Sequence, residues 1–334
     1  MQPESLESIR LLPKIELHLH LDCSLSESAI TQLIPGITHE EYLEEYTLPE
    51  KISGLEEFLS HTEKYVLLLQ TQAALELAVQ DIFKQLKADN VIYAEIRFAP
   101  FLHTQEGLSA DEVVSIISAQ TEIEIEKHGI QAGLILCTLR HFTTAQSMDT
   151  VHLVEKYRNK GVCGFDIASN EHLSLLPHVI AFEYAHHAEI NCTAHCGEAR
   201  GAESVVEVLD ILNPTRLGHG VRCIENDDLV HKLIRERIHL EFCPTCNVQL
   251  DVVPYYRLHP IDGLYRSGMQ LSVNTDNRSL TGIDLTGEYE KLTRYFGWEK
   301  ADFYATNLMA LRAAFTSDSI KEALADKLRS AYVD

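Results

Sequence analysis

The chain has 334 residues, of which 45% are hydrophobic, and its formal net charge is −22 at pH 7. This length is sufficient for one large core, and so acidic a chain is unsuited to nucleic acid or anionic membrane surfaces, which proteins bind through clustered lysine and arginine. We therefore expect a single domain over residues 1–334, a small-molecule ligand, and neither a nucleic-acid nor a membrane partner.

The start of the sequence shows no targeting signal. Residues 1–8 (MQPESLES) lack a basic segment followed by an apolar run, and no apolar stretch is long enough to span a bilayer. The eight cysteines are spread along the chain, which is typical of reduced thiols rather than of a disulfide framework. These features predict a cytoplasmic protein and leave its oligomeric state open.

The first predicted strand, Ile15–Leu21, carries the most informative pattern. Side chains two residues apart on a strand share a face, so His18, His20 and Asp22 point one way while leucines point the other. A His-x-His pattern can be a bland surface feature, but the apolar back indicates a core strand whose histidines face inward. Adjacent imidazoles are costly to bury without a partner, and a divalent metal is the commonest one.

A long interval, residues 24–90, separates this strand from the next. A helix predicted over residues 53–69 opens with a capping box at Ser53, and a second helical pattern follows it. An insertion directly above the first strand is well placed to form a lid, with Phe58 and Leu59 as an apolar roof. Ordinary packing accounts for most of its other apolar residues.

Apolar, β-rich runs recur along the chain, and most intervals between them have helical spacing. Eight such strands alternating with helices predict a (β/α)8 TIM barrel rather than a doubly wound sheet. The barrel would have a helical insertion after its first strand and closing helices over residues 287–334. The predicted strands are Ile15–Leu21, Val91–Phe98, Ala132–Leu139, Val162–Ala168, Ile190–Ala194, Arg216–Gly220, Ile238–Phe242 and Met269–Asn274.

In TIM barrels the active site forms at the carboxyl ends of the strands. Three imidazoles and a carboxylate, with one position left for water, form a catalytic zinc site, because closed structural sites are usually richer in thiolate. The strands above bring five ligand-type residues to that end of the barrel, enough for such a site: His18, His20, His195, His219 and Asp276.

Glu198 lies three residues beyond His195, after a glycine that permits a sharp turn. A carboxyl group held beside a metal without binding it suits general acid–base catalysis. The alternative is a glutamate at the start of a helix, stabilised by the helix dipole.

Four short motifs together resemble those of the adenosine deaminase family of the amidohydrolase superfamily. Residues 14–22 (KIELHLHLD) resemble the first-strand signature of that family, and residues 195–198 (HCGE) resemble its His-Ala-Gly-Glu motif. Residues 218–220 (GHG) and 274–276 (NTD) complete the set in the order of the family. The resemblance runs almost from end to end of the chain.

This resemblance implies hydrolytic deamination of adenosine or 2′-deoxyadenosine to inosine or 2′-deoxyinosine and ammonia. Zinc would lower the pKa of a bound water, and the resulting hydroxide would attack purine C6. Protonated Glu198 would donate to N1, and His219 would orient the hydroxide and stabilise its charge. The resemblance implies one zinc ion per chain, bound by His18, His20, His195 and Asp276.

The resemblance also implies contacts to the substrate, with departures that affect specificity. Asp22 would meet a ribose hydroxyl. The family usually has Gly-Asp after the fourth strand, where this chain has Ser169 and Asn170, and the backbone N–H of Ser169 would still reach purine N3. Asn277 replaces a second aspartate, and its amide can donate to N7 directly. Cys23 replaces a glycine at the end of the first motif.

Alternatives to this activity remain open from sequence. The substrate could be adenine or a modified adenosine such as aminodeoxyfutalosine. A non-catalytic purine-binding homologue would be expected to have lost metal ligands, and none is missing. Binuclear hydrolases of the superfamily usually bridge two metals with a lysine of the fourth strand, and residues 162–168 contain none.

Two further features bear on ligands. A single Cys-x-x-Cys at residues 243–246 has no second pair, so we interpret these cysteines as structural thiols. The acidic charge and the few cations near the motifs predict a neutral nucleoside rather than a nucleotide. Arg200, Arg222 and Arg278 are the exceptions, since an arginine can bind phosphate in a bidentate way.

Overall fold

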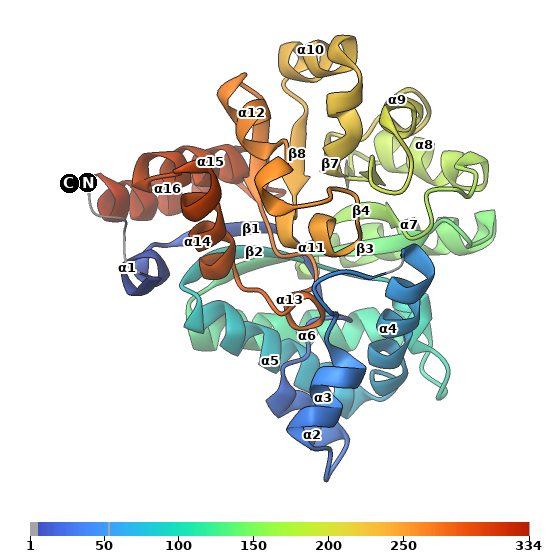
Figure 1. Ribbon diagram of the computed structural model, residues 1–334. Helices are drawn as coiled ribbons and strands as arrows, with labels where there is room; N and C mark the ends of the chain where they lie inside the picture. The colour runs from blue at the N-terminus through green and yellow to red at the C-terminus, as the bar shows by residue number, and fades with distance from the viewer. Residues whose placement is uncertain (1–5, 53, 334) are drawn as a thin grey trace.

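Parallel strands form two sheets at the centre of the molecule (Figure 1), seen in a computed structural model that describes residues 6–52 and 54–333. Helices surround these strands. The first sheet has the order β1 (Lys14–His20), β2 (Val91–Phe98), β3 (Gln131–Leu139), β4 (Val162–Ala168) and β5 (Asn191–Cys192). The second has the order β6 (His195–Cys196), β7 (Arg216–His219), β8 (His239–Phe242) and β9 (Gln270–Val273).

The two sheets close into a barrel where the last strand meets the first. Leu19 and Asp276 form a parallel bridge, and the backbone N–H of Asp276 donates to the carbonyl of His18 (3.0 Å). Just before this bridge the side chain of Asn274 replaces backbone pairing, because its Oδ1 accepts from the N–H of Leu17 (2.8 Å) and of His18 (3.2 Å). Together with its structural relatives given below, this closure confirms the predicted TIM-barrel fold.

One predicted strand is interrupted. Within the predicted run Ile190–Ala194 only β5 is regular strand. The chain is irregular at residues 193–194, and strand structure resumes as β6, which begins one residue beyond the predicted end. Its first part pairs with β4, whereas its second part pairs with β7 through Gly218 and His219. The backbone therefore changes partners within a few residues, and no single regular strand can serve both neighbours.

The insertion after β1 contains more helices than the sequence pattern indicated. Two short ones were missed, although Thr38 begins a capping box that marks one of them. The predicted cap at Ser53 lies outside the described residues, and the helix that follows it has Gly54 as its N-cap. The helices between β1 and β2 are α2 (Glu27–Leu33), α3 (His39–Tyr46), α4 (Leu55–Leu68) and α5 (Gln72–Ala88).

The remaining helices alternate with the strands and then close the barrel, as the sequence predicted for the region after the last strand. In Figure 1 the last two helices lie side by side next to β1. The helices are α1 (Leu6–Leu11), α6 (Ala110–His128), α7 (Thr144–Tyr157), α8 (Val179–His187), α9 (Ala202–Ile211), α10 (Asp227–Glu236), α11 (Pro244–Gln249), α12 (Ile261–Arg266), α13 (Arg278–Thr281), α14 (Leu285–Phe296), α15 (Lys300–Ala313) and α16 (Asp318–Tyr332).

Within the described part of the chain, no single helix is both long and apolar enough to cross a membrane. A bent pair, Glu57–Leu68 with Gln72–Ala88, meets that requirement by length and composition only when its two helices, 116° apart, are taken together.

We predict that Asn274→Ala destabilises the protein, because it removes the acceptor for two backbone N–H groups where the barrel closes. A buried donor left unsatisfied costs about 1–3 kcal/mol, so the free energy of unfolding should fall by about 2–5 kcal/mol. Urea denaturation followed by circular dichroism measures this loss. The exposed Asn159 provides a matched control as Asn159→Ala. Equal midpoints for the two variants would show that the Asn274 amide does not hold the closure.

Candidate active site

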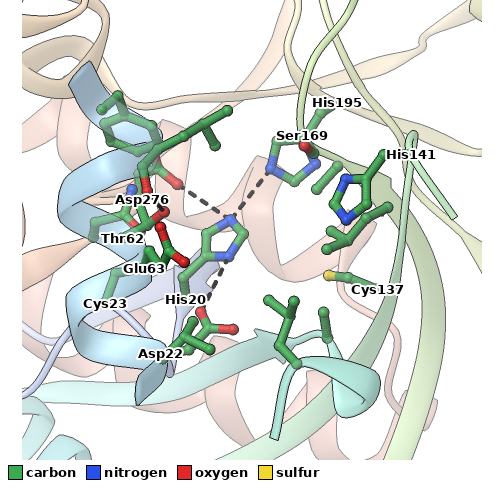
Figure 2. Close-up of a pocket in the computed structure, with 18 of the residues that line it drawn as sticks. His20, Asp22, Cys23, Thr62, Glu63, Cys137, His141, Ser169, His195 and Asp276 are labelled. Carbon is green, nitrogen blue, oxygen red and sulfur yellow. Dashed lines mark hydrogen bonds and ion pairs between the residues drawn. The ribbon is translucent and has the colours of Figure 1, made fainter. Parts of the chain in front are cut away.

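Four of the predicted side chains converge at the carboxyl ends of their strands. His20 Nε2 lies 3.3 Å from His195 Nε2 and 3.4 Å from Asp276 Oδ1, and Figure 2 shows these groups turned toward one another. His18 Nε2 lies 3.2 Å from the same carboxylate oxygen. The four ligand-type atoms all fall within 4.8 Å of one another, so this cluster can hold a metal ion. Which residues bind the metal stays a prediction.

Buried carboxylates orient two of these imidazoles. His18 Nδ1–H donates to Glu241 (2.9 Å), and His195 Nδ1–H donates to Asp166 (3.2 Å), which leaves both Nε2 lone pairs facing the cluster. Burial, together with the nearby Arg97 guanidinium, holds the pKa of His18 well below its usual range. A metal ligand must be a neutral imidazole, and three such nitrogens with one carboxylate are a donor set that fits zinc.

The Asp276 carboxylate is held from both sides. Cys246 Sγ–H donates to Oδ2 at 2.8 Å, while Oδ1 faces the imidazoles. Burial raises the pKa of Asp276, but the neighbouring His18 and His20 and the hydrogen bond from Cys246 lower it more, so the group stays ionised. The Cys-x-x-Cys pattern predicts only a structural thiol here, and the contact with the carboxylate gives Cys246 a role beside the cluster.

A second set of potential ligands shares part of the cluster. Its four ligand atoms also lie within 4.8 Å of one another, but all of its residues are buried. In the first set His20 is only partly buried and lines the adjoining cavity, so a metal there would be accessible to a substrate. The second set is His18, His219, Cys243 and Asp276.

Glu198 lies beside this cluster without belonging to it. Its Oε1 accepts from Asn247 Nδ2 (2.9 Å) and lies 3.2 Å from His219 Nδ1. Burial, and then the negative charges of Asp276 and Glu171, raise the pKa of Glu198 well above its usual range. The raised pKa favours the protonated carboxyl, which can donate its proton to a ligand.

Glu171 fixes the turn that carries Glu198. Its carboxylate accepts the backbone N–H of Glu198 (2.8 Å) and the hydroxyl of Ser204 (2.7 Å). The Ser204 oxygen in turn accepts the N–H of Gly197 (2.9 Å). A Cβ on Gly197, whose φ is +69°, would lie 2.7 Å from a valine methyl group, so only glycine fits this turn.

A cavity of about 370 Å³ opens next to the cluster and Glu198. All of the side chains predicted to contact substrate line it, together with Glu63, Gln105 and His141. No lysine or arginine is among its lining residues in the described chain. The predicted contact residues are Asp22, Phe58, Leu59, Ser169 and Asn277.

The backbone bends sharply where several site residues enter this cavity. Ser169, His219 and Asp276 have φ values of +81°, +57° and +66°. This left-handed conformation strains residues other than glycine, and such strain concentrates at functional sites. Ser169 occupies a position where the family usually has glycine.

The three arginines that left open a phosphate ligand are already paired. Arg200 and Arg222 each bind a nearby surface glutamate, Glu207 and Glu225. Arg278 is buried and lies 2.6 Å from Glu16. None of the three lines the cavity.

The cluster is supported by side chains whose roles the sequence pattern did not predict. A charged residue within an apolar strand run is the signal for two of them, since such a residue must point into the barrel. The other three lie in the segments after Cys243 or after the fourth strand, where no local sequence pattern indicates a role in the site. These residues are Asp166, Glu171, Glu241, Cys246 and Asn247.

Comparison with known proteins places this site in a family. The family model described as Adenosine deaminase matches residues 13–331. The chain belongs to the adenosine deaminase family. An adenosine deaminase of Clostridium acetobutylicum is 32% identical over 332 residues, which cover 96% of this chain and 98% of that protein. Family membership confirms the predicted resemblance and the expected class of reaction, hydrolytic deamination.

Solved structures of this fold include deaminases of different purines. The adenine deaminase of Arthrobacter aurescens has a TM-score of 0.88 and 25% identity, over 96% of this chain and 98% of that one. The N6-methyl-AMP deaminase of Arabidopsis thaliana has a TM-score of 0.87 and 26% identity, over 98% and 99%. The names of these relatives cover a nucleoside, a base and a nucleotide, so the family alone does not fix the substrate.

We predict that Cys246→Ala weakens binding of a divalent metal by about tenfold, because it removes a hydrogen bond that orients Asp276. Competition between the protein and a fluorescent chelator for Zn²⁺ measures the affinity. Cys246→Ser keeps a donor at the same position, and we expect its affinity to stay close to that of the native protein. Equal affinities for both variants would show that this contact does not support the site.

Proposed function

We propose that this protein deaminates adenosine and 2′-deoxyadenosine to inosine and 2′-deoxyinosine, with release of ammonia. The observation that carries the proposal is one cavity that adjoins both a cluster of three imidazoles with a carboxylate and a buried glutamate whose pKa is raised. Replacement of a purine amino group by water needs an activated water and a proton donor that act on the same ring. The cluster would supply the first and the glutamate the second.

The metal in this proposal is zinc, one ion per chain. When bound, zinc lowers the pKa of a water ligand toward neutrality. The donor set supports this choice, since three neutral imidazoles and one carboxylate suit zinc and leave a position for water. The ligands would be His18, His20, His195 and Asp276.

Glu198 and His219 perform the proton chemistry in this proposal. Burial beside other carboxylates raises the pKa of Glu198 and so favours its protonated form, which would donate to purine N1 as the ring loses aromaticity. Burial lowers the pKa of His219 well below its usual range, so the imidazole is neutral. Asn247 Nδ2 donates to Nδ1 of this ring, so Nε2 carries the hydrogen and would donate a hydrogen bond to the attacking oxygen. Asn247 holds both side chains in register, with contacts of 2.9 and 3.2 Å.

Side chains around the cavity would bind the rest of the nucleoside. Asp22 would accept a ribose hydroxyl, and the backbone N–H of Ser169 would donate to N3. The side-chain amide of Asn277 does not cap helix α13 and lines the cavity, so it can donate to N7. Phe58 and Leu59, on α4 above the cluster, would cover the purine.

The charges of the cavity favour a nucleoside over a nucleotide. Asp22, Glu63 and Asp276 line the cavity, and no lysine or arginine among the residues that the structure describes lines it to offset a phosphate dianion. Arg200 and Arg222, the nearby cations, are already bound to glutamates.

We predict that Glu198→Gln retains zinc but loses about 10²–10⁴-fold in the rate of adenosine deamination, because it removes the proton donor. The change in ultraviolet absorbance as adenosine becomes inosine measures the rate, and metal analysis of the same sample measures zinc. Glu203→Gln is the control, since Glu203 is exposed on the following helix. Native turnover in Glu198→Gln would refute the assignment, and inactivity of the native holoenzyme on adenosine would refute the proposed substrate.

We predict that adenosine is preferred to its monophosphate by at least about 100-fold in kcat/KM, because like charges brought together cost several kcal/mol. Parallel assays with adenosine, 2′-deoxyadenosine, adenine and N6-methyl-AMP extend this comparison across the substrates of the relatives. A preference for either monophosphate would contradict the proposed nucleoside specificity.

A further inference from the structure

A second hollow lies at the opposite end of the barrel from the candidate active site. Two cavities of about 560 and 340 Å³ are lined by residues at the amino ends of strands, among them Val162 in β4 and Arg216 in β7. Both are also lined by Asn191, Phe315 and Lys321. They therefore adjoin as one groove, which we name the basal groove, and no residue of the proposed catalytic set lines it.

The basal groove is cationic, although the chain as a whole carries a net charge of −22. Arg158 and Lys321 line its larger cavity, and Arg237, Arg312 and Lys321 line its smaller one. None of these four side chains has an ion pair with any carboxylate of the described residues. Glu189 is the acidic member of the lining. Such a local excess of unpaired positive charge must be offset by solution anions or by a ligand.

The wall of the groove is rigid. Arg216 is 1% exposed, and its guanidinium stacks on the Phe315 ring at 3.6 Å from the ring centroid. The same guanidinium donates to the carbonyl of Ala313 (2.8 Å) and is ion-paired with Glu95. These contacts fix the loop before α16 between two of the unpaired cations, Arg312 and Lys321.

Helix α16 borders the groove at its amino end. Thr316 and Ser317 line the larger cavity immediately before this helix, which is 15 residues long. Asp318 in the first turn and the Ser317 side chain, which accepts from the N–H of Ile320, offset the partial positive charge of this helix end, so the positive charge of the groove comes from its side chains. Lys321 lies one turn further along the same helix and donates to the carbonyl of Arg312 (3.0 Å), so its ammonium is held at the groove.

We propose that the basal groove binds a phosphate-bearing anion. Arginine presents a planar fork of donors that matches phosphate oxygens, and three of the four unpaired cations are arginines. The anion could be free phosphate or pyrophosphate, or the phosphate chain of a nucleotide. This proposal is independent of the proposed deaminase activity, because the groove lies at the other end of the barrel.

The test uses the zinc-loaded protein and a variant that lacks two groove cations, Arg237→Gln with Arg312→Gln. Both side chains are exposed, so the fold should persist. The matched control, Arg294→Gln with Arg329→Gln, removes the same charge from two exposed arginines that are already ion-paired. Isothermal titration with inorganic phosphate, pyrophosphate and ATP at constant ionic strength measures binding to each protein.

We expect saturable binding of at least one of these anions to the native protein and to the control. In the groove variant we expect the affinity for that anion to be at least about tenfold lower. Tighter binding of ATP than of pyrophosphate would identify a nucleotide, and equal binding would identify the phosphate groups alone as the ligand. Absence of saturable binding to the native protein, or equal affinity in the groove variant, would overturn the proposal.

Discussion

The buried guanidinium of Arg97 is the interaction on which the candidate site depends. It lies 2.8 Å from Asp166 and 2.7 Å from Glu241, and these three side chains are fully buried inside the barrel. Burial alone would raise the pKa of both carboxyls, but His195 and Arg97 lower the pKa of Asp166 to about 2, and Arg97 and Arg216 lower that of Glu241 to about 2. The two carboxylates therefore stay ionised and can orient His18 and His195. Loss of one partner would leave an uncompensated charge in the interior, which is strongly unfavourable.

A second arginine extends this network toward the other end of the barrel. Arg216 Nε lies 2.8 Å from Glu241, which also receives Arg97, so one glutamate joins two arginines and one imidazole. A buried ion-pair network of this kind tolerates little rearrangement, because no solvent water is available to replace a partner that a charged group loses. The orientation of the His18 imidazole consequently depends on contacts that extend through the barrel interior, away from the cavity.

The sequence predicted the parts of this protein that have local signals. Alternating leucines and histidines identified β1, and glycines and strand ends identified His219 and Asp276 as site residues. Short helices such as α3 were missed because two turns carry little periodicity. Asn247 and Glu171 were missed for a different reason: each acts through a neighbour that is distant in sequence, and only the folded chain brings the two together. The roles of the predicted ligands stay predictions, although the structure places them in one cluster.

The left-handed backbone at Ser169, His219 and Asp276 has a consequence for how this protein can change. Each such residue costs of order 1–3 kcal/mol, and the fold persists because the surrounding contacts determine these conformations. Three of the least relaxed positions thus coincide with the surface that would meet the ligand. Conformational stability and ligand recognition therefore place opposite demands on the same residues. Substitutions selected only for thermal stability would accumulate at these positions, and they would disturb a cavity that is preorganised for its ligand.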